Sequence, residues 1–469
     1  MASFGALSNE LKLIIIEAIE STWTASRLDD TSRWTTEHHF PIANTDLLRL
    51  SKVNHNLRNL VAPYIFRNII LRNTTRNGTS VALIASSRYA KYVKRVLFVG
   101  TNIQPRFHPD ASDPLKFHGI HLPEIVEQTL SELDHFPSLE GVDIWFRLQS
   151  HADFGSEEWA DDYYDFFLKD MTRPVLLDHV YLALTRNRPG TVRDLVLQNL
   201  VPVPSPTFER AEWHSFLGGL SSFGLQLYAS DGGWYPVFDH WDSRPESLLE
   251  AGIHFWRYLC NITHLSVSVG PQAVLGCNKD FTEPMLLNLG SAMLPNLKSV
   301  SFDFVFVGSI MLEFLLKHAA TLCSVHMDHS FVTQSDAPGV MPGSQMTWSK
   351  VFTALTDAPT PFSNLTKFEV LCTGDWETAE EYEIEQRARI EKDEQILGAG
   401  TPELRYCLID YASGEVTTAF DPDEELADES TGQDHTDLAQ PRPQRNADKL
   451  AYNRFMDTVK GNRERLGIA

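Results

Sequence analysis

A short β-like run recurs along this 469-residue chain, and its repetition is the feature that most constrains the fold. Apolar residues occupy the first, fourth and sixth places of each run, a pattern typical of a half-buried strand. Longer helical segments separate the runs, and strands that alternate with helices form mainly parallel sheets. The runs begin at Val93, Leu139, Val192, Ile262, Leu297, Leu322 and Leu365.

Several runs are introduced by a common phrase, seen at Phe136–Leu139, Leu294–Leu297 and Phe362–Leu365. The pattern resembles a leucine-rich repeat, in which each unit supplies one strand and one helix. Only the step from Val300 to Val325 has the usual repeat length of about 20–29 residues. The resemblance therefore implies an irregular solenoid with insertions over residues 71–412. One strand is missing between Leu195 and Leu265, and Phe223–Tyr228 is the candidate for it.

The fold class predicted from this alternation is α/β. An ordinary doubly wound α/β domain is the alternative, but the chain has no Gly-x-Gly-x-x-Gly after a strand and no Walker-type phosphate loop. We expect helices over Leu122–Phe136, Glu157–Leu184, Phe208–Leu217, Glu246–Leu259, Thr282–Met293, Ser309–Ala320 and Ser349–Leu355.

The N-terminal 70 residues carry two apolar stripes at helical spacing. Ser8 is suited to cap the first helix, and Glu10 lies in its first turn, where a negative charge is favoured. Thr45 can cap the second segment, and Pro63 is expected to end it and open a short third helix. Residues 21–44 between the two are predicted to be an inserted loop. The stripes consist of Leu7, Leu11, Ile14, Ile15, Ala18 and Ile19, and of Leu47, Leu50, Val53, Leu57, Leu60 and Val61.

These segments resemble the F-box as it appears in fungal proteins. Asp46–Asn54 matches the Leu-x-x-Leu-Ser-x-Val-Asn core of that motif, and Leu57–Arg67 matches its closing segment. Leu7–Leu11 stands in the place of the opening Leu-Pro-x-Glu-Leu, with Ser8 where the family has proline. The resemblance covers residues 1–70 and includes the inserted loop.

The resemblance implies that this module binds the Skp-type adaptor of a cullin–RING ubiquitin ligase. In the family the opening helix and the start of the next helix lie against that adaptor. Periodicity alone leaves another interpretation open, in which both stripes pack against the chain's own body. The contact residues implied by the resemblance are Leu7, Ser8, Glu10, Leu11, Ile14, Ile15, Leu47, Leu48, Leu50 and Val53.

The composition argues against several classes of partner. A formal net charge of −22 disfavours a general nucleic-acid or anionic-membrane binder, since both require clustered Lys and Arg. The five cysteines form no Cys-x-x-Cys pair, which disfavours a disulfide framework or a zinc site. No apolar run reaches the roughly 18 residues of a membrane span, and the N-terminus does not read as a signal peptide. We therefore expect no cofactor, no metal and a cytoplasmic or nuclear location.

No motif of a known catalytic class is present. A Gly-x-Ser-x-Gly elbow and a His-Glu-x-x-His motif are both missing from the sequence. The pairs His118 with His121 and His326 with His329 are poorly placed for a metal. Asp161, Asp162 and Asp165 are explained as a solvated acidic face. The sequence predicts a protein that is not itself an enzyme.

Target binding is assigned to aromatic residues in or near the insertions, because aromatic side chains dominate interface energetics. Burial of each residue under its own loop is the alternative. The candidates are Trp145, Trp159, Tyr163, Trp234, Tyr235 and Trp241.

The C-terminal part is predicted to contain four elements. Trp376–Leu397 reads as a charged helix, and Tyr406–Tyr411 as a last strand. Residues 413–448 are polar and acidic and are expected to be a disordered linker. Residues 449–469 are expected to form a short helix with a thin apolar edge.

Taken together, the sequence predicts a substrate-recognition subunit of an SCF-type ubiquitin ligase. Its N-terminal helices would hold the adaptor and its repeat body would hold an unknown protein target. Two alternatives stay open. One is a repeat scaffold that acts without a ligase, and the other is an enzyme with a site on loops of the solenoid.

Overall fold

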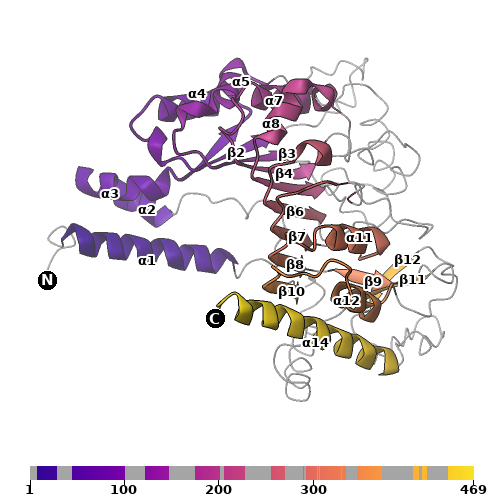
Figure 1. Ribbon diagram of the computed structural model, residues 1–469. Helices are drawn as coiled ribbons and strands as arrows, with labels where there is room; N and C mark the ends of the chain where they lie inside the picture. The colour runs from indigo at the N-terminus through magenta and orange to yellow at the C-terminus, as the bar shows by residue number, and fades with distance from the viewer. Residues whose placement is uncertain are drawn as a thin grey trace, which may run out of the picture. The chain divides into compact units, whose positions relative to one another are not determined.

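A computed structural model gives the architecture (Figure 1). It describes residues 8–28, 45–100, 122–146, 175–200, 205–227, 255–269, 289, 292–303, 305, 307–328, 330–333, 346–371, 405–410, 415–419 and 442–468. The chain divides into two compact units, Met1–Gln226 and Leu227–Ala469.

Nine strands form one parallel sheet, and their order in the sheet is their order in the chain. A doubly wound domain reverses its strand order at a switch point, and these strands show no reversal. The structure is therefore α/β, as predicted, but not doubly wound in the part it describes. The strands are β1 (Asn68–Arg72), β2 (Arg95–Gly100), β3 (Gly141–Phe146), β4 (Asp194–Leu200), β5 (Ser222–Leu227), β6 (His264–Val269), β7 (Ser299–Asp303), β8 (Ser324–Asp328) and β10 (Lys367–Leu371).

The apolar residues that occupy equivalent positions in the sequence pattern also lie opposite one another in the register of the sheet. Val142 of β3 lies opposite Val96 of β2 and Leu195 of β4. In the second unit Leu265, Val300, Val325 and Phe368 form a continuous row in the same way. The strand expected between Leu195 and Leu265 is β5, which includes Phe223 and lies between β4 and β6.

Most strands are joined to the preceding one by the same pair of backbone bonds, just before or at the strand's first residue. The carbonyl of Arg67 accepts from the amides of Lys94 and Arg95, and the carbonyl of Lys94 accepts from Glu140 and Gly141. This pattern recurs at the carbonyls of Glu140, Arg193, Thr263, Lys298 and Cys323. Most strand–helix units are thus attached to the preceding one by one repeated geometry, although the connecting segments differ in length.

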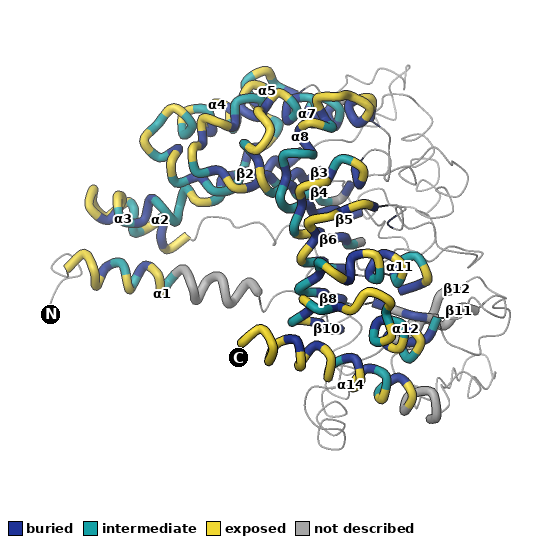
Figure 2. Tube along the Cα trace, viewed as in Figure 1, coloured by how far each residue is buried: buried dark blue, intermediate teal, exposed yellow. Residues whose placement is uncertain are grey.

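In the first unit, the helices from Thr75 onward (α4, α5, α7 and α8) form a layer on one face of the sheet. Phe98 of β2 lies 6.0 Å from the ring of Phe146, which lies 6.2 Å from Tyr181 of α7. Tyr181 in turn contacts Trp213 of α8 at 5.5 Å between ring centroids. Sheet and helices therefore share one aromatic core. Figure 2 shows how buried and exposed residues are distributed along these elements. The helices are α1 (Asn9–Leu28), α2 (Thr45–Ser51), α3 (His55–Ile65), α4 (Thr75–Ala85), α5 (Glu124–Ser131), α7 (Val175–Thr185) and α8 (Ala211–Gly218).

The second unit repeats this layering. Phe302 of β7 packs edge-on against Phe314 of α11 (Ser309–Lys317) at 6.0 Å. Phe368 of β10 packs against Phe352 of α12 (Trp348–Thr356), also at 6.0 Å. A last helix, α14 (Arg442–Arg465), packs on α12.

A small three-stranded sheet completes the second unit. It joins β9 (Phe331–Thr333), β11 (Arg405–Asp410) and β12 (Glu415–Ala419), with β11 in the middle. The strand predicted over Tyr406–Tyr411 is β11, although it belongs to this sheet and not to the main one.

Some elements of the C-terminal part lie at other residues than the sequence predicted. Residues 413–448 were expected to be disordered throughout, but β12 and the start of α14 lie within them. The C-terminal helix accordingly begins at Arg442, before the expected residue 449. The charged helix over Trp376–Leu397 lies outside the described residues.

Candidate partner-binding site

The helices α1, α2 and α3 form a small module with its own core. Ile16 of α1, Leu47 of α2 and Val61 of α3 are buried against one another. Two polar contacts hold α1 along α3: the Tyr64 hydroxyl donates to Glu17 at 3.3 Å, and Asn56 donates to Asn9 at 3.2 Å. The module is continuous with β1, which begins three residues after α3.

The sequence predicts one long second helix that ends at Pro63. The structure instead has two helices here, α2 and α3, with a break between them. The second segment ends at Ser51, and the side chain of Asn54 caps α3 by accepting from the amide of Leu57 at 2.8 Å. Pro63 lies inside the last turn of α3, so the prediction that it opens a new helix is wrong. The capping asparagine starts a new helix after the break, at a residue type that is strongly preferred for helix N-termini.

The first turn of α1 is built as the sequence predicts. Ser8 precedes the helix, and its hydroxyl accepts from the amide of Leu11 at 3.4 Å. A hydrogen bond from its own backbone amide, together with one from Ser8, lowers the pKa of the exposed Glu10. Ser8 therefore starts this helix at the position where the F-box family has proline.

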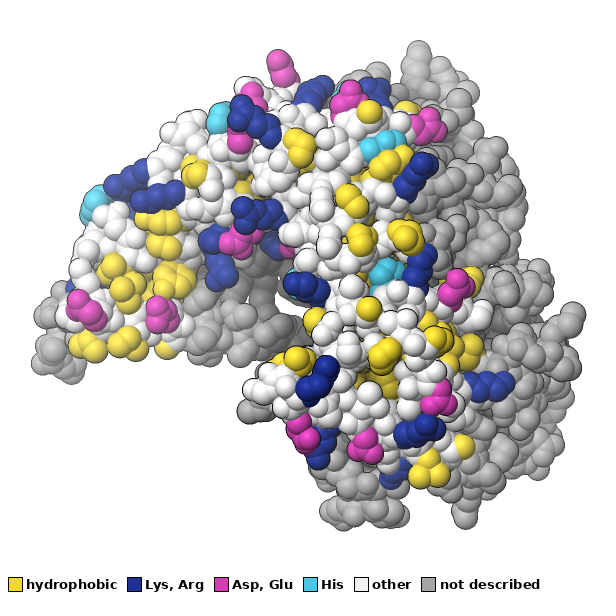
Figure 3. All heavy atoms as spheres, viewed as in Figure 1, with side chains coloured by type: hydrophobic (Ala, Val, Ile, Leu, Met, Phe, Trp, Pro, Cys, Tyr) yellow, Lys and Arg dark blue, Asp and Glu magenta, His cyan; other side chains and the backbone are white. Residues whose placement is uncertain are grey.

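The two sides of α1 differ sharply in exposure. Ile16 is fully buried, while Leu11 is 49% exposed and Ile14 is 60% exposed. Leu11, Ile14 and Ala18 are three and then four residues apart, so they share one side of the helix. We call these three residues the outer face of α1. Hydrophobic side chains gather over this module in Figure 3.

The α2 residues named by the resemblance divide between core and surface. Leu47 is buried in the module core, and Leu50 packs against that core. Leu48 is half-buried, and Val53, which follows α2, is 66% exposed. Leu7 lies outside the described residues, and Ile15 is half-buried. Among the nine predicted contacts that the structure describes, the exposed aliphatic ones are therefore Leu11, Ile14 and Val53.

No family model and no curated protein matches this chain. The resemblance of this module to the F-box therefore rests on its own residues alone.

The residues predicted to bind a target are mostly outside the described part of the chain. Trp159, Tyr163, Trp234, Tyr235 and Trp241 all fall there. Trp145 lies on β3 and is buried, in one cluster with Leu97 and Val99 of β2. Trp145 is therefore buried, but against the neighbouring strand and not under its own loop, which was the alternative stated for it.

Chemistry-bearing clusters are sparse in the ranges that the structure describes. No group of three or more His, Cys, Asp or Glu is placed there to hold a metal ion. His326 contacts Glu369 at 3.1 Å on neighbouring strands, and Lys367 contacts the same carboxylate at 2.9 Å. His118, His121, His329 and the three aspartates at 161, 162 and 165 lie outside these ranges.

A half-buried ion cluster lies near the start of β2, β3 and β4. Arg95 donates to Asp143 at 2.7 Å and to Asp194 at 2.6 Å. Burial raises the pKa of Asp143 despite its bond to Arg95. Two carboxylates thus share one guanidinium, an arrangement that ties three neighbouring strands together.

Proposed function

We propose that this chain is the substrate-recognition subunit of an SCF-type ubiquitin ligase. Its α1–α3 module binds a Skp-type adaptor of the cullin ligase, and its strand–helix body binds the protein target. In this role the chain has no catalytic step of its own. It acts in the cytoplasm or nucleus, where such ligases work. Among the described residues no helix has the length and apolar character that crossing a membrane requires.

The observation that supports the docking role is the division of α1 into two sides. Its inner side supplies Ile16 to the module core, while its outer face presents Leu11 and Ile14 to solvent. Apolar side chains at three- and four-residue spacing on one face of a helix are the anchors that helix-in-groove contacts use. The inner contacts also mean that the outer face can engage a partner while the module stays folded.

The repeated attachment of strand to strand supports a solenoid body. Most of the described units contact the preceding unit through the same pair of amide bonds, as expected for a stack of repeats. Such a stack can accept long insertions between units without changing the register of its strands. We propose that the body is an irregular leucine-rich-repeat-like solenoid and that its insertions carry the target contacts.

Reconstitution with a purified Skp-type adaptor tests this function. The full-length chain should form an equimolar complex that co-elutes in size-exclusion chromatography with light scattering. Addition of the cullin scaffold should extend that complex. Failure to form a complex at tens of micromolar of each protein, with the chain folded by circular dichroism, would refute the docking role.

A scaffold that works without a ligase is the second candidate, favoured by Ser8 in the place of the family's proline. It shares the solenoid body but leaves the outer face of α1 without an adaptor. Affinity capture from an extract that contains adaptor and cullin separates the two. Recovery of other proteins with neither ligase subunit would support the scaffold.

A further inference from the structure

Residues 45–100 carry a charge opposite to that of the chain as a whole. They contain ten Lys and Arg residues and one acidic residue, Asp46, while the full chain has a formal net charge of −22. The segment includes α2, α3 and the short turn η2 (Ala90–Tyr92). In Figure 3, Lys and Arg side chains gather beside the hydrophobic ones of the α1–α3 module. An acidic chain therefore presents a positive surface next to the proposed docking helices.

The basic residues begin at the turn between α2 and α3. Lys52 is exposed and precedes Val53, an exposed residue of the predicted adaptor contact. The Nε of Arg58 donates to the carbonyl of Ser51 at 3.1 Å, which places this guanidinium beside the same turn. The positive charge is thus continuous with the apolar docking residue Val53.

Arg88 extends this surface along α3. It donates to the side chain of Asn59 at 3.0 Å and to the hydroxyl of Tyr89 at 3.1 Å. Asn59 follows Arg58 on α3, so the two guanidinium groups lie on neighbouring parts of one helix surface. The ring of Tyr89 stacks on Phe66 with 4.6 Å between centroids, which fixes the segment that carries Arg88 against the end of α3.

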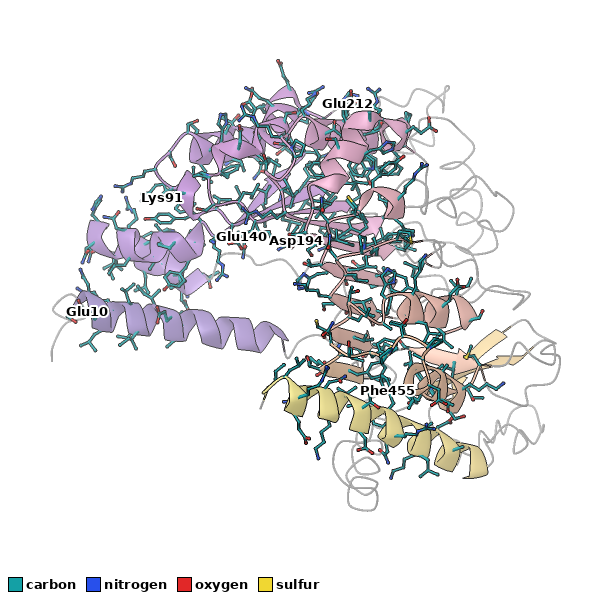
Figure 4. All side chains as sticks on the ribbon, in the orientation of Figure 1. Glu10, Lys91, Glu140, Asp194, Glu212 and Phe455 are labelled. Atoms are coloured by element: carbon teal, nitrogen blue, oxygen red, sulfur yellow. The ribbon has the colours of Figure 1, made fainter. Side chains whose placement is uncertain are left out.

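Lys91 completes the group. Its ammonium lies 5.1 Å from the centre of the Tyr92 ring, and the residue is labelled in Figure 4. All four cations are exposed, and in the part of the chain that the structure describes no carboxylate lies within ion-pair distance of any of them. Their contacts hold the charged groups in place without neutralising them. We call these four residues, Lys52, Arg58, Arg88 and Lys91, the basic rim.

From this arrangement we infer that the basic rim receives an acidic segment of the Skp-type adaptor, an inference that rests on the proposed function. The rim is continuous with Val53, so a subunit that covers Val53 comes within reach of Lys52 and Arg58. Exposed cations at the edge of an apolar contact raise the association rate for a partner of opposite charge. An extended polyanion such as a nucleic acid would also meet the acidic remainder of the chain, which favours a short run of Asp and Glu on the adaptor.

Adaptor binding at low and at high salt tests the rim. The triple variant Arg58→Gln, Arg88→Gln and Lys91→Gln should bind about three- to tenfold more weakly than the wild type at about 50 mM salt, because each exposed ion pair contributes little. At about 500 mM salt the two should bind alike, since salt screens exposed charges. Stopped-flow kinetics should show the loss mainly in the association rate.

A matched control removes the same charge elsewhere in the first unit. Arg76→Gln, Arg188→Gln and Arg193→Gln change exposed cations on α4, in a loop and just before β4, and this variant should bind like the wild type at both salt concentrations. Equal affinity and equal salt response of the rim variant and the wild type would overturn the inference. Equal weakening by the rim variant and the control would also overturn it, because net charge alone would then explain the effect. A wild-type chain that does not bind the adaptor at all would refute the docking role itself, and the rim with it.

Cross-linking of the wild-type complex provides a test that requires no folded variant. A carbodiimide couples lysines to the carboxylates that they contact. Lys52 and Lys91 should therefore be joined to Asp or Glu residues of the adaptor, as read by mass spectrometry of the digested complex. Cross-links to the adaptor that come only from other lysines of the chain would contradict the basic rim.

Discussion

Arg95 of β2 donates a hydrogen bond to Asp194 of β4, two strands away, at 2.6 Å. Gly141 of β3 lies in register between them. A Cβ atom at Gly141 would lie 3.1 Å from the Cβ of Asp194 and 3.2 Å from a guanidinium nitrogen of Arg95. Because Gly141 has no side chain, Arg95 of β2 can reach across β3 to Asp194 of β4. Asp194 is labelled in Figure 4, as is Glu140, which precedes Gly141.

Replacement of this glycine should break the join. Gly141→Val is expected to lower the free energy of unfolding by about 1–3 kcal/mol, because the new side chain overpacks the space between Arg95 and Asp194. The urea midpoint of unfolding measures this. Gly461→Ala in α14 is the matched control, since no atom lies within 4 Å of its Cβ position. The control should be neutral or stabilising by up to about 1 kcal/mol. A Gly141→Val variant as stable as the wild type would contradict the account of the cluster.

Acid should weaken the second unit through His318. Its Nδ1 bonds the carbonyl of Phe314 at 2.8 Å, and its Nε2 accepts from the amide of Leu294 at 3.3 Å. This pairing requires the neutral ring, and burial lowers the pKa of His318 below 6.5. The unfolded chain then binds the proton more readily, so stability is lost as pH falls below about 6.5.

The variant His318→Gln should show a flatter pH profile than the wild type between pH 5 and pH 7. Chemical denaturation across this range is the measurement. An equally steep loss in the variant would assign the acid sensitivity to other groups.

Asp448 should affect the pH dependence of stability in the direction opposite to His318. Burial raises the pKa of its carboxyl to about 6, even though Ser349 donates hydrogen bonds to it. The folded chain therefore holds the proton more tightly than the unfolded chain, and this group's contribution falls as pH rises from about 4 to about 6. Asp448→Asn keeps an oxygen for the amide of Ser349 and removes the charge.

The expected result is a variant that is more stable than the wild type at pH 7, with the two converging below pH 4. Thermal unfolding at a series of pH values measures the difference. A variant less stable than the wild type at pH 7 would show that the ionised carboxylate favours the packing of α14 on α12.

The strand core could be predicted from the sequence because it repeats one local pattern. Val96, Val142 and Leu195 were matched by their place within each run, and the register matches them too. Phe223 was assigned to a missing strand because the spacing required one. The small sheet of β9, β11 and β12 was not predicted, since β9 has only three residues and joins strands far apart in the chain.

The orientation of α1 could not be predicted from its periodicity. Leu13, Ile14, Ile15 and Ile16 follow one another, so apolar residues surround the helix at this point. The sequence placed Ile14 and Ile15 on the stripe and left Ile16 out of it, but Ile16 is the residue that reaches the core. Contact with Leu47 and Val61, and not the local pattern, decides which side of the helix is inside.

The affinity of the chain for a Skp-type adaptor, measured by isothermal titration with changes confined to the outer face of α1, tests the central claim most directly. Leu50 packs against the module core, so a charge there would also disturb the fold of the module. The substitution combined with Leu11→Asp is therefore Ile14→Asp, which lies on the outer face of α1. The double variant Leu11→Asp with Ile14→Asp should bind at least about 100-fold more weakly than the wild type, because it places two charges in an apolar interface. Leu83→Asp, on α4 and 66% exposed, is the control and should bind normally. Unchanged affinity of a folded double variant would contradict the claim that this face holds the adaptor.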